Sequence, residues 1–315
     1  MAIKKLNIIL FIAEIVLVII TVLVYYLANP INSSKVVYIP KGPINKIISY
    51  LEDKSFSLSG IDSYIVRFIG KPQSGWIDIG QKKLSRGDFL YKLTTAKAPL
   101  IEITLIPGET TTLFLKEVAE KLGLSYEKLK NEFFIQSPFK EGVILPETYH
   151  IPKGIDEKHL IYYLVNNSLK RHKEIANKIF GRYEQDKWFG KYITIASIIQ
   201  KEAANEKEMP LISSVIYNRL KKGMPLQMDG ALNYGDYSHT KITRKRIQSD
   251  LTRFNTYKFK GLPPYPVCNV SLSAIKAAVF PAKTEYLYFV KSGKKRHKFS
   301  KTYKNHINNI KSVKK

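Results

Sequence analysis

A long apolar run from Leu6 to Leu27 is the feature that most restricts how this chain can fold. As an α-helix, its 22 residues span roughly 33 Å, enough to cross the hydrocarbon core of a bilayer. A cleavable signal has a shorter apolar region and small residues before the cut, whereas bulky Tyr26 and Leu27 stand near the end of this run. The sequence therefore predicts one uncleaved transmembrane helix.

The charges around this run favour a cytoplasmic N-terminus. Lys4 and Lys5 flank its N-terminal end, although three lysines follow within 20 residues of its other end and weaken the asymmetry. We predict a single-pass protein of the cytoplasmic (inner) membrane, with its remaining chain on the periplasmic or extracytoplasmic side. Glu14 lies near mid-span, where an ionised group is costly. A buried partner and a neutral or snorkelling glutamate are both open interpretations.

The chain is strongly basic, with a formal net charge of +25 over 315 residues. Such an excess requires an acidic counterpart, which can be anionic lipid, nucleic acid or a carboxylate-rich polymer. Residues 283–315 hold eleven Lys or Arg against Glu285 alone, and a solvated basic tail is an equal explanation for them. The single cysteine, Cys268, excludes an internal disulfide and a cysteine-based metal site.

Two N-terminal segments share one pattern, which is a β-branched strand, an Ile-Pro turn with glycine, and an amphipathic helix. They are residues 36–59 and 101–125. Between them, residues 62–70 and 100–106 are predicted as strands, and residues 84–93 as a short helix. Small α+β units are therefore expected directly after the anchor.

The second half of the chain has a helical pattern followed by long irregular segments. A helix is predicted over residues 156–180, and two more helices are joined near Met209-Pro210, because proline suits the first turn of a helix. The predicted fold class is α+β, with a transmembrane helix, small α+β subdomains and a larger mixed α+β domain. The predicted domains are residues 1–30 for the N-terminus and anchor, 31–140 for the small α+β region, and 141–315 for the larger domain with its basic tail.

Glu202 lies on the apolar face of a helical pattern, which is an unusual place for a charged residue. The apolar residues on that face are Ile195, Ile198 and Ile199. Burial raises the pKa of a carboxyl group and leaves it partly protonated near neutral pH, as a general acid requires. The alternative is a structural glutamate paired with a cation such as Arg219. Glu206 shares the face but lies near the helix end, so it is the weaker candidate.

Seven segments in sequence order resemble the YceG-like (MltG) endolytic murein transglycosylases. They are 105-LIPGETT-111, 145-LPETYHIPKG-154, 195-IASIIQKEA-203, 215-VIYNRLKKGMPLQMD-229, 255-NTYKFKGLPPYPVCN-269, 274-AIKAAVFPA-282, and 286-YLYFV-290 with His297, Phe299 and Ser300 after it. The resemblance covers almost the whole chain, including the anchor. It implies a membrane-anchored enzyme facing the cell wall, with a LysM-like portion where the repeat lies and a domain that cuts glycan strands internally.

The same resemblance implies that Glu202 is the catalytic acid. In the implied mechanism, Glu202 protonates the oxygen that links N-acetylmuramic acid to N-acetylglucosamine. Its carboxylate then takes the proton of the muramic C6 hydroxyl, which attacks C1 and closes a 1,6-anhydro ring. One carboxylate suffices because the substrate supplies the nucleophile, unlike the two-carboxylate scheme of most glycosidases. If a second acid takes part, Asp229 is the candidate and the reaction is ordinary hydrolysis.

Two irregular segments, residues 223–235 and 253–269, are expected to line a substrate groove. Amide side chains can donate and accept hydrogen bonds to sugar hydroxyls and N-acetyl groups, and tyrosines can stack on sugar faces. The predicted substrate-binding residues are Gln227, Tyr234, Asn255, Tyr257 and Asn269, with Tyr265 as a further stacking candidate. For each of them, a loop-fixing hydrogen bond or a packing ring is the alternative.

The chain departs from the family pattern in two of these segments. Residues 229–231 read Asp-Gly-Ala where the family has Asp-Pro-Thr, and residues 269–271 read Asn-Val-Ser where it has Asn-Pro-Gly. Glycine at position 230 loosens a turn that proline would stiffen, while the acid is unchanged.

Two other classes of function are alternatives for the same residues. One is a non-enzymatic tether that binds the cell wall, with a structural Glu202, and another is a basic membrane-anchored nucleic-acid binder. The histidines lack metal-ligand spacing, and no serine or cysteine nucleophile motif occurs, so neither metal nor cofactor is predicted. No signature of nucleic-acid reading accompanies the charge. The predicted partners are glycan strands, the membrane and, as further candidates, peptidoglycan synthases.

Overall fold

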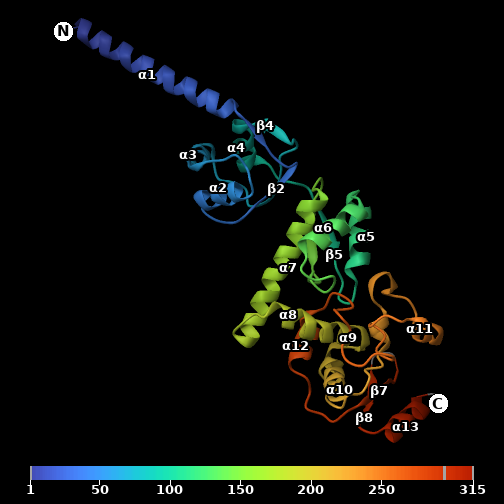
Figure 1. The fold of residues 1–315 in the computed structure, drawn as a ribbon. Coiled ribbons are helices and arrows are strands. Elements are labelled where there is room, and N and C mark those ends of the chain that lie inside the picture. The colour runs from blue at the N-terminus through green and yellow to red at the C-terminus, as the bar shows by residue number, and fades with distance from the viewer. Residues whose placement is uncertain (1, 294–295, 314–315) are drawn as a thin grey trace. The chain divides into compact units, whose positions relative to one another are not determined.

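The structure, a computed structural model, describes residues 2–293 and 296–313 (Figure 1). Four lysines of the basic C-terminal region lie outside the described residues, at positions 294, 295, 314 and 315. Helices alternate with short strands that form two-stranded sheets, so the predicted α+β class is confirmed. The chain divides into two compact units. Unit 1 comprises residues 1–101 and 150–155, and unit 2 comprises residues 102–149 and 156–315.

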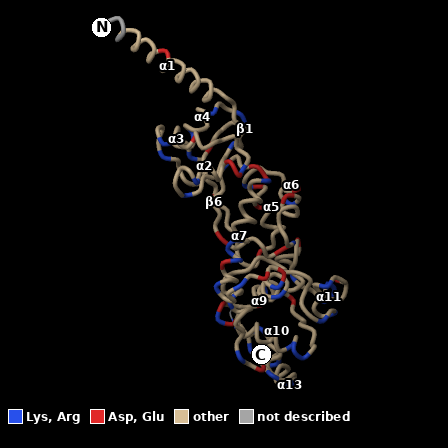
Figure 2. Tube along the Cα trace, turned by 60° about the vertical axis from the view of Figure 1, so that its left-hand side comes forward, with Lys and Arg blue, Asp and Glu red and all other residues tan. Residues whose placement is uncertain are grey.

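Unit 1 begins with the apolar helix α1, Ala2–Ala28. Its stretch from Leu6 to Ala28 is long and apolar enough to cross a membrane, and none of that stretch is buried inside the protein. Glu14 is the only acidic residue of α1. Beyond α1, Figure 2 shows Lys and Arg positions along the rest of the described chain. One long apolar helix at the N-terminus is therefore confirmed.

The rest of unit 1 is built around a β-α-α-β segment. Its elements are β2 (Val36–Ile39), α2 (Ile44–Asp53), α3 (Gly60–Ile69) and β3 (Gly75–Asp78). Strands β2 and β3 pair antiparallel with Val37 opposite Ile77, and the flanking strands β1 (Pro30–Asn32) and β4 (Lys83–Ser85) pair in the same way. Helix α4 (Arg86–Thr95) completes the unit and confirms the helix predicted there. Apolar faces of these elements form one core, to which Leu27 of α1 also contributes.

Helix α3 replaces the strand that the sequence predicted over residues 62–70, and that prediction was wrong. Its β-branched and aromatic residues favoured a strand, but Ser59 and Asp62 form a capping box that starts a helix. Asp62 is fully buried, and hydrogen bonds that it accepts from Tyr26 and Arg86 offset the cost of burying its charge. Tertiary contacts of the cap residues therefore outweigh the local strand propensity.

Unit 2 is mostly helical. Its helices are α5 (Thr111–Leu122), α6 (Tyr126–Gln136), α7 (Glu157–Phe180), α8 (Gln185–Lys187), α9 (Thr194–Glu202), α10 (Met209–Lys221), α11 (Arg244–Ser249), α12 (Leu272–Val279) and α13 (Tyr303–Val313). Two C-terminal strands of this unit, β7 (Tyr288–Lys291) and β8 (His297–Ser300), pair antiparallel. Strands β5 (Leu100–Thr104) and β6 (Thr148–Pro152) form a sheet where the chain passes between the units.

Several predicted elements of unit 2 are confirmed with their expected ends. Helix α7 is capped by Asp156, whose side chain accepts from the amide of His159. Helix α10 begins at Met209 with proline in its first turn, and β7 occupies the predicted aromatic strand. The segment 253–269 contains no helix or strand, and 223–235 contains only the short turns η3 (Asp229–Leu232) and η4 (Gly235–Tyr237). These irregular segments lie against the helical core at α9, which contacts η3, α10 and α12.

Candidate active site

Glu202 is the last residue of α9, and its surroundings follow from the apolar face that precedes it. Ile195, Ile198 and Ile199 are fully buried, so the helix is fixed against its neighbours. A π-helical turn, η1 (Trp188–Ile193), leads directly into α9, and such widened turns are frequent at functional sites. The Glu202 side chain keeps part of its surface open to solvent. The apolar face predicted from the sequence therefore delivers a carboxyl group to an accessible helix end.

One backbone donor holds the carboxyl group of Glu202. The amide of Gly230 in η3 donates to Glu202 Oε1 at 2.6 Å. A Cβ atom at position 230 would lie 2.6 Å from Lys201 Cβ and 3.0 Å from Glu202 Oε1. Glycine is therefore what permits η3 to approach the end of α9 this closely.

The electrostatic surroundings raise the pKa of Glu202 to about 7. Burial is the main cause, because it disfavours the charged form, and the negative charge of Asp229 acts in the same direction. The amide of Gly230 opposes them by stabilising the carboxylate. A carboxyl group in this state is present in both protonation forms near neutral pH, so it can donate a proton and later accept one.

Asp229 and Tyr257 border the same carboxyl group. The Tyr257 hydroxyl donates to Asp229 Oδ1 at 2.7 Å, while the Asp229 side chain remains exposed. Burial and the negative charges of Asp229 and Glu202 together raise the pKa of Tyr257. Tyr257, predicted as a substrate contact, thus lies at Glu202 and has its hydroxyl directed at Asp229.

A second polar chain, which the sequence did not predict, lies at Lys201. Its Nζ donates to the hydroxyl of Ser238 at 2.8 Å, and Ser238 also bonds to Glu109, which forms a 2.7 Å hydrogen bond with His239 Nε2. Burial tends to raise the pKa of Glu109, but hydrogen bonds from His239, Thr110 and Ser238 lower it overall. This chain brings the 105–111 segment to the side of α9 next to the acid, a contact across more than 90 residues.

Glu141 is a second buried carboxyl group of unit 2, with a side chain that is entirely enclosed. It accepts hydrogen bonds from the amide and hydroxyl of Thr111 and from the amide of Gly142. Burial raises its pKa to about 7 in spite of these donors and of the nearby charge of Lys201. Only 5% of the residue is exposed, so Glu141 is enclosed by groups that already use its lone pairs.

Two of the predicted substrate-binding amides fix loops in this structure. Asn255 is fully buried, and its amide donates to the carbonyls of Ile247 and Asp250. Asn269 is also fully buried and donates to the Glu109 carbonyl and the Thr111 hydroxyl, which leaves its Oδ1 without a partner. Both arrangements match the loop-fixing alternative.

The other predicted contacts are more accessible. Gln227 is exposed, with a backbone φ of +50°, and the Tyr234 ring stacks on Phe254 at 4.2 Å while its hydroxyl donates to Asp250. Tyr265 packs edge-on against the same Phe254. Gln227 and Tyr234 thus remain predictions as sugar contacts, on the segment that carries Gly230.

The alternative partner for Glu202 is occupied elsewhere. Arg219 donates to the carbonyls of Leu226 and Leu287 rather than to a carboxylate. Glu206 lies in the exposed turn η2 (Glu206–Glu208), outside α9. His297 binds Glu208 through Nδ1 at 2.9 Å and through its backbone amide, which ties β8 to the start of α10. Among the described residues, no group of three or more His, Cys, Asp or Glu side chains could hold a metal ion.

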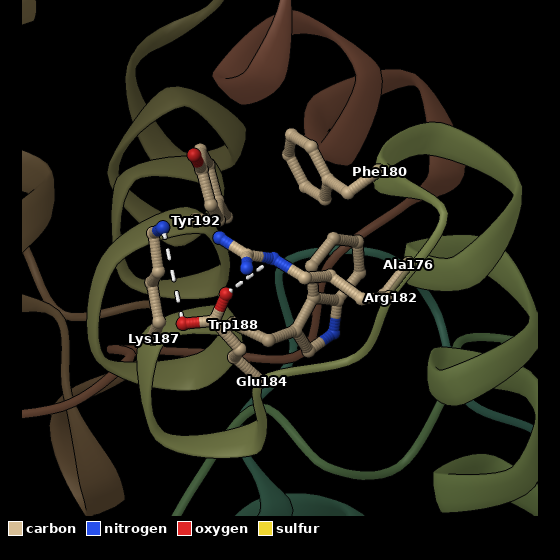
Figure 3. A pocket seen from close by; sticks show the side chains of 7 residues that line it. All are labelled: Ala176, Phe180, Arg182, Glu184, Lys187, Trp188 and Tyr192. Atoms are coloured by element: carbon tan, nitrogen blue, oxygen red, sulfur yellow. Dashed lines mark ion pairs between the residues drawn. The ribbon is translucent and has the colours of Figure 1, made fainter.

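A separate pocket of about 420 Å³ opens between the end of α7 and η1, away from every predicted site residue (Figure 3). Phe180, Trp188 and Tyr192 supply its aromatic walls, and Glu184 forms ion pairs there with Arg182 and Lys187. The Trp188 indole nitrogen donates to the buried His172, so only its ring faces the pocket. This pocket is distinct from the surroundings of Glu202.

Residues 37–312 match the model of the YceG-like family. This chain belongs to the YceG-like family. A relative from Bacillus subtilis (strain 168), named endolytic murein transglycosylase, is 31% identical over 243 residues, which are 71% of this chain and 66% of the relative. A Streptococcus pneumoniae (serotype 2, strain D39) relative of the same name is 30% identical over 196 residues, 58% of this chain and 35% of its own length. The chain therefore spans just under two thirds of the first relative and about a third of the second.

A solved structure shares the fold. The 2.6 Å crystal structure of a YceG-like protein from Listeria monocytogenes superposes with a TM-score of 0.57 at 26% identity. The superposition covers 87% of this chain and 97% of that protein. The chain therefore resembles that protein in fold as well as in sequence.

Proposed function

We propose that this protein is a membrane-anchored endolytic murein transglycosylase that uses Glu202 as its general acid and base. The observation that carries the proposal is the state of Glu202, an accessible carboxyl group with a pKa raised to about 7 and a single backbone donor. The relatives from Bacillus subtilis and Streptococcus pneumoniae, both named endolytic murein transglycosylase, support the same reaction. Burial of the acid is what suits it to protonate a leaving group near neutral pH.

In the proposed reaction, Glu202 donates its proton to the oxygen between N-acetylmuramic acid and N-acetylglucosamine as the bond from that oxygen to the muramic C1 breaks. The resulting carboxylate takes the proton of the muramic C6 hydroxyl, and the C6 oxygen bonds to C1. The proton count closes on Glu202, which ends as it began. The Gly230 amide keeps the carboxylate aimed during the second step.

The neighbours of Glu202 have separate roles in this proposal. Asp229 keeps the acid protonated through its negative charge, and Tyr257 holds Asp229 in place through their hydrogen bond. The exposed Gln227 and the partly buried Tyr234 lie on the segment that carries Gly230, along which the glycan strand would run. No water nucleophile is needed, because the C6 hydroxyl of the substrate takes that part.

The remainder of the proposal concerns location. Helix α1 anchors the chain in the cytoplasmic membrane as a single span, with the rest of unit 1 and the whole of unit 2 on the extracytoplasmic side, where peptidoglycan lies. The β2-α2-α3-β3 order with an antiparallel strand pair supports a LysM-like role for unit 1. Peptidoglycan synthases, which supply nascent strands, are the proposed protein partners.

The test is the chemistry of the cut ends. Full-length protein in detergent micelles is incubated with purified, uncrosslinked glycan strands, and the products are identified by mass spectrometry beside a sample without enzyme. The proposal expects internal cuts that end in 1,6-anhydro-muramic acid. Reducing ends would instead indicate hydrolysis with Asp229 as second carboxylate, and strands that are bound but uncut would indicate a tether.

A further inference from the structure

Helix α3 carries an apolar face that nothing in unit 1 covers. Ile61, Tyr64 and Phe68 are 60%, 68% and 96% exposed. Their spacing of three and four residues places them on one side of the helix, within about 60° of each other at 100° per residue. Phe68 is almost fully exposed and lies beside two further large side chains. Together they form a contiguous apolar surface rather than isolated exposed residues.

The opposite side of α3 already serves the core. Asp62, Ser63 and Val66 are its buried residues, and they project roughly 165° away from the exposed face. A helix on the surface of a water-soluble domain normally has charged or polar residues on its outer side. The outer side of α3 is instead apolar, and the exposed Arg67 lies at its edge.

The start of α3 is fixed to the end of the apolar helix α1. The Tyr26 hydroxyl bonds to Ser59 at 3.0 Å and donates to Asp62 at 3.1 Å. Arg86 completes the junction with a 2.7 Å ion pair to Asp62 and with its guanidinium 4.4 Å from the centre of the Tyr26 ring. A Cβ atom on Gly87 would lie 3.5 Å from Leu27 Cβ, so α4 packs closely on the same turn of α1.

This junction sets the level of α3 relative to the membrane. Tyr25 and Tyr26 end the apolar stretch, as aromatic residues do at the boundary between hydrocarbon and water. Because Ser59 and Asp62 bond to Tyr26, α3 begins at that boundary, and Figures 1 and 2 both place α2 farther from α1 than α3. The naked face of α3 is therefore next to the place where lipid headgroups begin.

We propose that the outer face of α3 lies in the headgroup region of the same bilayer that α1 crosses, with Phe68 inserted as its deepest side chain. Ile61 and Tyr64 would contact the upper acyl chains, and Tyr64 places its hydroxyl among the headgroups. Arg67, which donates to Asn45 of α2 at 3.0 Å and stands 5.6 Å from the centre of the Tyr64 ring, keeps its positive charge beside this face, at the level of anionic lipid phosphates. Unit 1 then has two attachments to the membrane, which fix its orientation where one helix would leave it free to swivel. The proposal rests on the span proposed above.

The test uses single cysteines that carry an environment-sensitive nitrobenzoxadiazole label on the full-length protein. The native Cys268 is fully buried, so surface positions are labelled selectively. Phe68→Cys is the reporter, Asp53→Cys at the exposed end of α2 is the matched control within unit 1, and Leu17→Cys in α1 reports the span. The protein is reconstituted in nanodiscs of phosphatidylethanolamine and phosphatidylglycerol, either without nitroxide or with a mixture of lipids that carry the nitroxide just below the headgroup and near the middle of the acyl chain.

The expected result is a blue-shifted emission at position 68 and at least twofold quenching by the nitroxide lipid, as at position 17, with neither effect at position 53. Emission at position 68 that is water-like and unquenched would overturn the proposal. A blue shift without quenching by lipid would also overturn it, because a second protein surface would then cover α3. Quenching lost at position 17 would reject the span itself, and this inference with it, while leaving the proposed reaction at Glu202 untouched.

Discussion

Glu202 and Glu141 are two carboxyl groups of one unit whose pKa values are both raised to about 7 by burial. Their surroundings differ in two respects. Glu141 is enclosed and accepts from three donors, whereas Glu202 is partly open and accepts from one. A raised pKa therefore marks burial and not a role, and free lone pairs with an open approach are what distinguish an acid that can reach substrate.

The consequence is a division of work between the two groups. Glu141 ties the 105–111 segment to the loop at Gly142, since all its donors come from those two places. Asn269 bonds to the same Thr111, so this network also fixes the loop that ends at Asn269. Glu202 lies at the end of α9, and the Gly230 amide of η3 is its only hydrogen-bond donor among the described residues.

The largest expected effect comes from removing the acidic proton of Glu202, the partly open carboxyl group of the pair. Glu202→Gln keeps the acceptor for the Gly230 amide but cannot donate a proton in the first step. General acid catalysis contributes about 10²- to 10⁴-fold, so turnover on glycan strands falls by that factor. The thermal midpoint at pH 7 stays at or above that of wild type. A Glu202→Gln protein that retains more than a tenth of wild-type turnover would remove Glu202 from the chemistry.

Removing the enclosed member affects folding instead. Glu141→Ala leaves the amides of Thr111 and Gly142 and the Thr111 hydroxyl without their acceptor. At about 1 kcal/mol or more for each buried donor, the free energy of unfolding falls by about 3 kcal/mol. Urea titration measures the change, and Glu174→Ala on the exposed side of α7 is the control with a change near zero. Equal stability of the two variants would contradict the structural role.

A third change tests the single donor of Glu202. In Gly230→Ala, the new Cβ would lie 2.6 Å from Lys201 Cβ, so η3 must move and the 2.6 Å bond to Glu202 lengthens. We expect turnover to fall about tenfold, equivalent to roughly 1.4 kcal/mol of the barrier. Gly190→Ala is the control, because its Cβ would meet no atom within 4 Å. If both variants turn over like wild type, the amide does not position the acid.

The smallest expected effect is on the pH dependence of stability. The pKa of Glu202 is raised from 4.5 to about 7, so the folded state binds the proton more tightly than the unfolded chain does. The stability contributed by this proton is complete below pH 4.5 and is lost as the pH rises through 7. Glu202→Gln should therefore gain on wild type between those values, by on the order of 1 kcal/mol after partial exposure is allowed for. Urea midpoints at pH 4 and pH 8 check this, and a difference that does not change with pH would contradict the raised pKa.

The sequence predicted most of the helices because their signals are local. Asp156 caps α7 and proline begins α10 within a few residues of the pattern that they delimit. Helix α3 was missed because its β-branched and aromatic residues outweighed the Ser59 and Asp62 box in the prediction. The same residues, Ile61 and Phe68, turn out to be exposed, so their apolar character serves something other than the core of unit 1.

The site was predictable where it depends on one helix and unpredictable where loops meet. The apolar face that contains Glu202 follows from helical spacing alone. The bond from Gly230 joins residues 28 positions apart through an irregular segment, and no sequence spacing fixes such a contact. The side-chain amides of Asn255 and Asn269 could bond to a sugar or to a backbone carbonyl equally well. Only their complete burial and their hydrogen bonds to carbonyls reveal that they hold loops.

The most direct test of the comparison is the pH dependence of turnover in Glu141→Gln beside wild type, with rates normalised to the folded fraction. Both carboxyl groups have a pKa of about 7, so the wild-type profile alone does not assign its falling limb. If Glu202 is the acid, activity falls as the pH rises through 7 in both proteins with the same midpoint. A limb that shifts or disappears in Glu141→Gln would show that Glu141 controls the reaction, and it would contradict the assignment of Glu202 as the acid and Glu141 as a structural group.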